Sequence, residues 1–175
     1  MSKKFIAISG SLRKQSFNSM LLRAVKDLAP ESINIEIVDI GELPLYNTDL
    51  EADFPSVAQE LKDKIASSDG VIFATPEYNR SISGVLKNAI DWVSRPYGKN
   101  SFAHKKALVM GASVGQVGTA IAQSHLKHTL LHLDMHVIGQ PEFYLGAAQE
   151  KFDASGNLTD ENTKKHIITA LEALN

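Results

Sequence analysis

Two short polar stretches carry side chains that could hold a phosphorylated, flat ligand. The first, GSLRKQSFNS, spans residues 10–19 and combines hydroxyl, amide and cationic groups. The second, PEYNR, spans residues 76–80 and combines a carboxylate, an aromatic ring, an amide and a guanidinium. Hydroxyl groups and cations are typical phosphate ligands, and a tyrosine beside an amide can border a planar ring. The two stretches could share one ligand only if the fold brings them together.

The first stretch comes just before a predicted helix, where backbone N–H groups and the helix dipole favour an anion. It contains neither the G-x-x-x-x-G-K-[ST] motif of Walker A loops nor the G-x-G-x-x-G motif of dinucleotide-binding folds. One alternative is a solvated turn in which a serine only caps the helix. We favour phosphate binding. The polar side chains available for it are Ser11, Arg13, Lys14, Gln15, Ser16, Asn18 and Ser19.

Apolar runs alternate with amphipathic segments along the whole chain. The run at 5–8 is continuous, as in a central strand covered on both faces, whereas residues 33–37 alternate as in an edge strand. The predicted strands cover residues 4–9, 33–37, 71–74, 107–110 and 135–138. Five helices are predicted. Three of them lie between residue 19 and Pro30, over 56–66, and from Ser83-Gly84 to Arg95-Pro96. The fourth covers 119–133, and the last begins near Thr159-Asp160.

This alternation predicts an α/β fold with a doubly wound, five-stranded parallel sheet of strand order 2-1-3-4-5, the flavodoxin-like arrangement. We expect residues 1–175 to form a single domain. In such a sheet the ligand lies at the switch point, beside the loops after strands one, three and four. The third of these loops, residues 111–118, offers Ser113 and backbone groups near Gly115. A phosphate site beside loops that can line a flat heterocycle suggests a mononucleotide cofactor, and flavin mononucleotide (FMN) suits this topology.

Composition excludes several other classes of protein. The 175 residues include 20 acidic and 18 basic side chains, for a net charge of −2, which argues against nucleic-acid binding. Cysteine is absent, so disulfides, thiol catalysis and thiolate metal sites are excluded. The apolar run near the N-terminus is too short for a signal peptide or a membrane span. We expect a soluble, cytoplasmic protein.

The sequence resembles the NADPH-dependent FMN reductases, in the branch of chromate, quinone and azo reductases. The resemblance covers nearly the whole chain and rests on GSLRKQSFN, PEYN…GVLKNAIDW and GASVGQVG, in that order. It implies bound FMN, NADPH or NADH as electron donor, and a homodimer or homotetramer. It further implies three groups of cofactor-binding residues. Those for the phosphate are Ser11, Arg13, Ser16, Phe17, Asn18 and Ser19; those beside the isoalloxazine ring are Pro76, Glu77, Tyr78, Asn79 and Arg80; Ser113 and Gly115 complete the pocket.

The expected activity is hydride transfer from NAD(P)H to the flavin and then to a quinone, flavin, azo or metal-oxyanion acceptor, by a ping-pong mechanism. It needs no catalytic acid or base from the protein, because the redox chemistry belongs to the flavin. The alternative is an electron carrier, but such carriers tend to be strongly acidic, whereas this chain is nearly neutral. Two positions depart from the family pattern: Ser83 stands where proline is frequent, and Arg80 stands where an aromatic or small polar residue is expected.

Other residues invite different interpretations. His125, His128 and His132 share one predicted helix face, but no carboxylate accompanies them, so a polar or interfacial stripe is favoured over a metal site. Ser113 lacks the G-x-S-x-G setting of a hydrolase nucleophile. The remaining expectations are local: Lys87–Asp91 as a surface pair, Trp92 in the core or an interface, Tyr46 or Asn47 within reach of the ligand, Thr159 as a helix cap, and Ile167, Ile168, Leu171 and Leu174 buried by the last helix.

Overall fold

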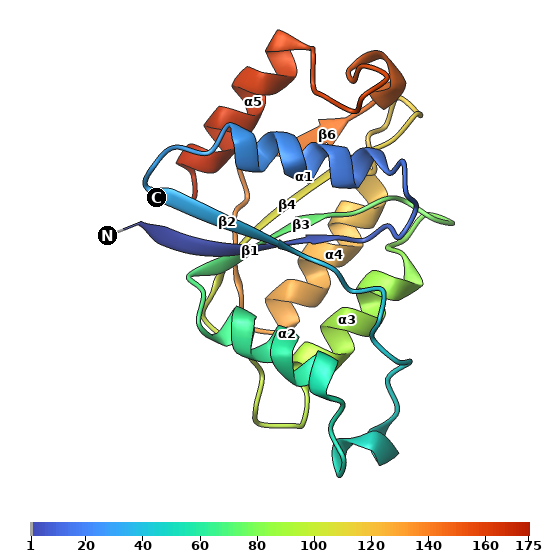
Figure 1. Ribbon diagram of the computed structural model, residues 1–175, viewed down its shortest axis with the longest axis vertical. Helices are drawn as coiled ribbons and strands as arrows, with labels where there is room; N and C mark the ends of the chain where they lie inside the picture. Colours follow the sequence, from blue (N-terminus) through green and yellow to red (C-terminus); the bar gives the residue numbers. More distant parts are fainter. Residues whose placement is uncertain (1) are drawn as a thin grey trace.

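Residues 2–175 of the computed structural model form a parallel sheet with helices on both faces (Figure 1). The strands are β1 (Lys3–Ser9), β2 (Ile33–Val38), β3 (Gly70–Ala74), β4 (Lys106–Ala112), β5 (His136–Val137) and β6 (Phe143–Leu145). The helices are α1 (Phe17–Asp27), α2 (Ser56–Ala66), α3 (Gly84–Ser94), α4 (Ala120–His132) and α5 (Glu161–Glu172), with short 3-10 turns η1 (Thr48–Glu51) and η2 (Ala148–Glu150).

The strand order β2-β1-β3-β4-β5 confirms the order predicted from the sequence. The prediction missed β6, which also pairs with β4, so the fifth position of the sheet holds two short segments. β5 lies beside the start of β4 and β6 beside its end, where Met110 pairs with Phe143. Three residues are too few to show a strand period, and only pairing with the buried β4 makes them a strand.

Two apolar clusters hold the layers together, one on each face of the sheet. Alternate residues of β1 point to opposite faces, so Phe5 packs on the side of α1 and α5, whereas Ile6 packs on the side of α2, α3 and α4. Trp92 is fully buried in the second cluster, as predicted. With apolar side chains on both faces, β1 and β3 occupy inner positions of the sheet, and the loops that follow them start from buried strands.

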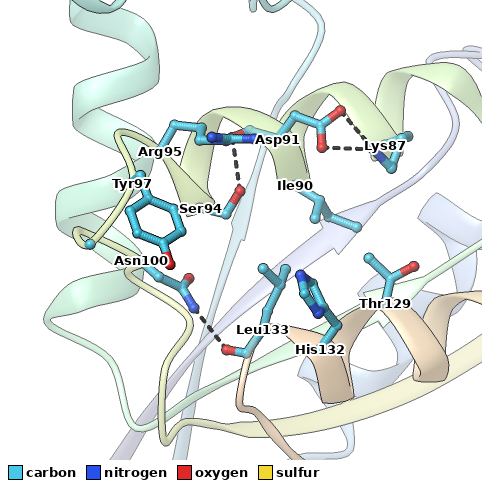
Figure 2. Close-up of a pocket in the computed structure, with 11 residues that line it drawn as sticks. Lys87, Ile90, Asp91, Ser94, Arg95, Tyr97, Asn100, Thr129, His132 and Leu133 are labelled. Atoms are coloured by element: carbon cyan, nitrogen blue, oxygen red, sulfur yellow. Dashed lines mark hydrogen bonds and ion pairs between the residues drawn. The ribbon is translucent and has the colours of Figure 1, made fainter.

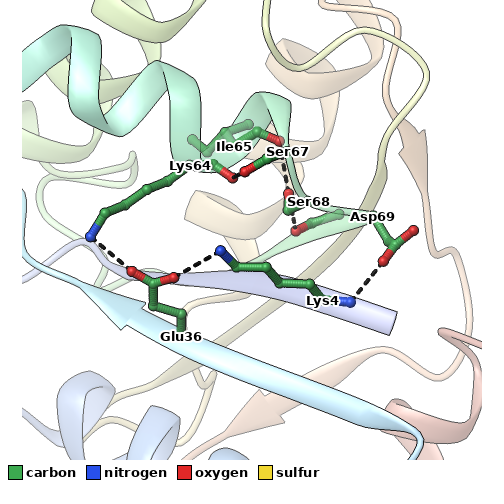
Figure 3. A network of polar contacts seen from close by, with 8 residues as sticks. Lys4, Glu36, Lys64, Ile65, Ser67, Ser68 and Asp69 are labelled. Carbon is green, nitrogen blue, oxygen red and sulfur yellow. Dashed lines mark hydrogen bonds and ion pairs between the residues drawn. The ribbon is translucent and has the colours of Figure 1, made fainter. Parts of the chain in front are cut away.

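The edge strand β2 carries charge toward solvent. The Glu36 carboxylate forms ion pairs with Lys4 at 3.1 Å and with Lys64 at 2.8 Å (Figure 3). The Asp69 carboxylate accepts a hydrogen bond from the backbone N–H of Lys4. Hydrogen bonds from the two lysines, that from Lys64 being the larger effect, hold the pKa of Glu36 below its usual value. Charges on an edge strand discourage pairing with another sheet edge.

The last helix differs from prediction in two details. Asp160, not Thr159, caps α5: its Oδ1 accepts the N–H of Thr163 at 2.8 Å and the Thr163 hydroxyl at 2.6 Å. These bonds, with help from Lys151, lower the pKa of Asp160 to about 2. Ile168 is 42% exposed, because the buried stripe of the helix runs through Ile167 and Leu171 instead.

The loop between β2 and α2 is anchored on α3 rather than on the ligand cleft. The ring of Tyr46 packs edge-on against Trp92 at 5.1 Å, and its hydroxyl donates to Glu51 at 2.6 Å. Asn47 caps η1. The structure thus gives both residues a role in shaping this loop. Among residues 2–175, no helix is both long and apolar enough to cross a membrane.

Candidate cofactor-binding site

Three loops meet at the carboxyl ends of β1, β3 and β4 and enclose a cleft of about 290 Å³. Nine of the thirteen predicted residues line it, together with Ala112 and Val114, which sequence reasoning did not select. Ser19, Asn79, Arg80 and Gly115 do not line it. The lining residues are Ser11, Arg13, Ser16, Phe17, Asn18, Pro76, Glu77, Tyr78, Ala112, Ser113 and Val114.

The first loop is ordered by its own serines. Ser16 is only 2% exposed and caps α1 by accepting the N–H of Ser19 at 3.4 Å. The hydroxyl of Ser19 donates to Ser9, the last residue of β1, which explains why Ser19 lies outside the cleft. The first-turn N–H groups of Phe17 and Asn18 have no acceptor four residues earlier within the helix, so they suit an anion.

Asn18 joins the first loop to the third. Its Nδ2 donates to the carbonyl of Ala112 at 3.0 Å, and its Oδ1 accepts the N–H of Ala112 at 2.9 Å. Both groups of this buried amide are therefore engaged by the protein. Asn18 therefore ties the start of α1 to the strand end that precedes Ser113, so its side chain shapes the cleft.

Arg13 brings an exposed positive charge to the cleft. Its guanidinium lies 5.6 Å from the ring centroid of Phe17, which in turn packs against Phe152 at 5.9 Å. Within residues 2–175 no ion pair includes Arg13 or Lys14. An exposed guanidinium without a carboxylate partner can bind a phosphate bidentately.

The second loop is a tight turn. Tyr78 and Ser81 exchange two backbone hydrogen bonds of 3.0 Å, and the central residues Asn79 and Arg80 have φ of 51° and 64°. Positive φ at both central positions is typical of the type I′ turn, and asparagine tolerates it better than arginine does. The turn holds the ring of Tyr78 at the cleft while the Arg80 side chain, 73% exposed, points to solvent.

Glu77 has a role that the sequence did not reveal. Its Oε2 accepts the N–H groups of Ile121 and Ala122, each at 3.1 Å, and its Oε1 pairs with Arg80 at 3.3 Å. Thr119, the residue that precedes α4, has a φ of 67° and its side chain makes no capping hydrogen bond. Glu77 therefore caps α4 from another loop, with its charge at the positive end of the helix dipole.

Close packing near the end of β4 depends on a glycine. A Cβ on Gly111 would collide with Thr119 Oγ1 and with the carbonyl of Thr75. Beyond it, Ser113 Oγ accepts the N–H of Gly115 at 3.0 Å. Gly115 thus positions Ser113, which does line the cleft.

A larger cavity, of about 510 Å³, lies between α3 and α4 and shares no residue with the cleft (Figure 2). The predicted pair Lys87–Asp91 is confirmed there, at 2.7 Å. His132 lines this cavity, whereas His125 bonds to Ser81 at 3.2 Å. In the part of the chain that the structure describes, no three histidine, aspartate or glutamate side chains group as metal ligands do.

A doubly wound sheet with a phosphate-suited loop at its switch point defines a flavodoxin-like mononucleotide-binding protein. Comparison with known families narrows this class. The family model of the NADPH-dependent FMN reductases matches residues 3–150. The chain belongs to this family.

Curated relatives and solved structures agree. The chain is 46% identical to a 2-hydroxy-1,4-benzoquinone reductase from a Burkholderia species, covering 98% of this chain and 94% of the relative. It is also 46% identical to an NAD(P)H-dependent FMN reductase of Pseudomonas aeruginosa, covering 98% and 92%. The structure of FerB, a flavoenzyme NAD(P)H:(acceptor) oxidoreductase from Paracoccus denitrificans, superposes with a TM-score of 0.92 at 44% identity, covering 98% and 94%.

Proposed function

We propose that this protein is an FMN-dependent NAD(P)H:quinone oxidoreductase. The observation that carries the proposal is the convergence of a phosphate-suited loop and a tyrosine turn at the sheet's switch point. Family membership and relatives named quinone reductase or FMN reductase point the same way.

The residues of the cleft fit FMN. Arg13, Ser11 and the first-turn N–H groups of α1 would hold the phosphate, and the Ser16 hydroxyl keeps a hydrogen to donate. Tyr78 and Ser113, on opposite loops, would border the ring, with Glu77 and Asn18 fixing the spacing between these loops. When bound, the flavin supplies the hydride-accepting and hydride-donating chemistry.

Kinetically, we propose a ping-pong cycle in which NAD(P)+ leaves before the acceptor reacts. Azo compounds, free flavin and metal oxyanions extend the proposed range of acceptors beyond quinones. Hydride transfer through the flavin needs no acid or base from the protein, so the protein's part is to bind and orient the reactants. We further propose that residues 1–175 act as one domain within a homodimer or homotetramer.

The rival function is a one-electron carrier. Carriers of this fold tend to be strongly acidic for docking, whereas here the net charge is only −2 and a cation, Arg13, lines the cleft. This charge distribution favours an enzyme that attracts an anionic pyridine nucleotide.

One experiment tests the enzyme against the carrier. Purified protein supplemented with FMN should show a saturable flavin absorbance that NADPH bleaches without oxygen. Steady-state rates with a quinone should then give parallel double-reciprocal lines. Intersecting lines would exclude the ping-pong cycle, and absence of saturable flavin binding would exclude the function itself.

A further inference from the structure

A second cavity, of about 460 Å³, adjoins the cofactor cleft. Ser11, Arg13 and Tyr78 line both spaces, so a ligand in one can touch a ligand in the other. Arg13 is the only charged residue in its lining, which is otherwise largely apolar. We name it the Leu45 cavity, after its most exposed large apolar side chain; the other apolar side chains of its wall include Leu12, Leu43 and Val85.

One wall of the Leu45 cavity is pinned to α3. Asn88 accepts the N–H of Tyr46 at 2.7 Å and donates to the carbonyl of Pro44 at 2.9 Å. The indole of Trp92 donates to the same carbonyl at 2.7 Å. Leu45 lies between these two anchored residues and is nevertheless 83% exposed. A leucine fixed in place but open to water gains free energy when an apolar ligand covers it.

The floor of the Leu45 cavity includes Gly84, the first residue of α3. A Cβ at this position would meet no heavy atom within 4 Å. The preceding Ser83 fixes the floor, since its hydroxyl donates to the carbonyl of Gly10 at 2.6 Å. The space above Gly84 is therefore free for a ligand, bounded by apolar side chains and by Tyr78.

We propose that the Leu45 cavity binds the uncharged ring system of the electron acceptor, a quinone of one or two rings. The inference rests on the proposed function and adds where the acceptor sits. The volume lies within the range of small-molecule sites, and the Tyr78 hydroxyl offers a donor for a quinone oxygen. The overall reaction balances as NAD(P)H, one proton and quinone giving NAD(P)+ and hydroquinone.

The test fills the cavity from its floor. Gly84→Leu is compared with Gly139→Leu, where an added Cβ also meets nothing within 4 Å but which does not line the cavity. Each variant is assayed with 1,4-naphthoquinone and with ferricyanide, a hydrophilic acceptor. The kcat/KM for 1,4-naphthoquinone divided by that for ferricyanide should fall about tenfold in Gly84→Leu. This is the effect expected from losing one to two apolar contacts. The ratio should stay unchanged in Gly139→Leu.

A second measurement does not depend on turnover. Calorimetry measures binding of 1,4-dimethoxynaphthalene, which cannot be reduced, to FMN-supplemented protein without NADPH; Gly84→Leu should weaken it about tenfold. If Gly84→Leu does not fold, Leu45→Asp takes its place in both measurements. Losses in both support the proposal. An unchanged kcat/KM ratio or an unchanged affinity for 1,4-dimethoxynaphthalene overturns the proposal. A smaller oligomer of Leu45→Asp in sedimentation also overturns it, because Leu45 would then be a subunit contact. Failure of wild-type protein to oxidise NADPH would instead overturn the proposed function.

Discussion

Asn18 at the start of α1 and Ala112 at the end of β4 exchange two hydrogen bonds, of 3.0 and 2.9 Å, across 94 residues of sequence. Both residues are buried. The pair ties two walls of the cleft together, because Asn18 belongs to the stretch 10–19 and Ala112 precedes Ser113.

We expect Asn18→Ala to lower the free energy of unfolding by about 2–4 kcal/mol, since it leaves a buried N–H and a buried carbonyl of Ala112 without partners. FMN affinity should fall as well, because the two loops lose their spacing. Urea unfolding and flavin titration measure the two effects. Asn162→Ala, the exposed second residue of α5, is the control and should change neither. Equal stability of the two variants would contradict the role given to Asn18.

Arg13→Ala should weaken FMN binding by about 1.5–3 kcal/mol, or roughly ten- to a hundredfold, through loss of a charge-assisted contact to the phosphate. Riboflavin, which lacks the phosphate, should bind both proteins alike. Fluorescence titration with the two flavins measures the difference, and Arg23→Ala, at an exposed position of α1, serves as the control. A matched loss for riboflavin would assign Arg13 to the ring or to the fold.

Glu77→Gln should destabilise the protein by about 1 kcal/mol, because the amide oxygen can still accept from Ile121 and Ala122 but brings no charge to the helix dipole. Glu77→Ala, which removes the cap entirely, should lose about 1–2 kcal/mol. Thermal and urea unfolding rank the two variants, with the exposed Glu60→Ala as control. The order wild type, Gln, Ala is the expected one. A Gln variant no more stable than the Ala variant would show that the cap does not work through these bonds.

Arg80→Ala separates a substrate contact from a structural one. The Arg80–Glu77 pair is largely solvated on the arginine side, so it adds little to stability. If Arg80 instead meets anionic substrates, its loss should weaken NADPH and a sulfonated azo dye by roughly 1.5–3 kcal/mol. An uncharged quinone should be nearly unaffected and provides the internal control. Steady-state kinetics with the three substrates decide, and equal losses on all of them would indicate a structural role.

Lys62→Met removes a buried ammonium group that donates to the carbonyls of Val93 and Lys99, each at 2.8 Å. At pH 7 the variant should lose about 1–3 kcal/mol, as the unpaired carbonyls outweigh relief of the buried charge. Burial lowers the pKa of Lys62 below its usual 10.5. Between the lowered pKa and 10.5 the unfolded chain binds more protons than the folded one, so wild-type stability rises with pH there.

The methionine variant has no such titration, so the difference in unfolding free energy between the two proteins should widen as the pH approaches 10.5. Urea unfolding at several pH values measures it, with exposed Lys165→Met as the matched control. A difference that narrows with rising pH would mean that the charged form of Lys62 is the favoured one in the folded state.

The sheet and its helices were predictable because their signals are local. The continuous apolar run of β1, the alternation in β2 and the turn residues between elements each reflect a period that a short window contains. Strand order followed from two general rules, that central strands are buried on both faces and that crossovers are right-handed. The polar loops could be placed at the cleft because they follow parallel strands, whose carboxyl ends meet at one edge of the sheet.

What individual side chains do was decided only by tertiary structure. The carboxylate of Glu77 and the amide of Asn18 belong to ligand-like stretches of sequence, yet both bond to backbone groups more than 40 residues away. The segment β6 became a strand only beside β4, and Leu45 became the wall of a cavity only because Asn88 holds its neighbours. Sequence patterns specify which groups are available at the sheet edge. Some of these side chains instead bond to backbone groups of distant elements that would otherwise lack a partner. Only the tertiary structure shows which side chains remain available to a ligand.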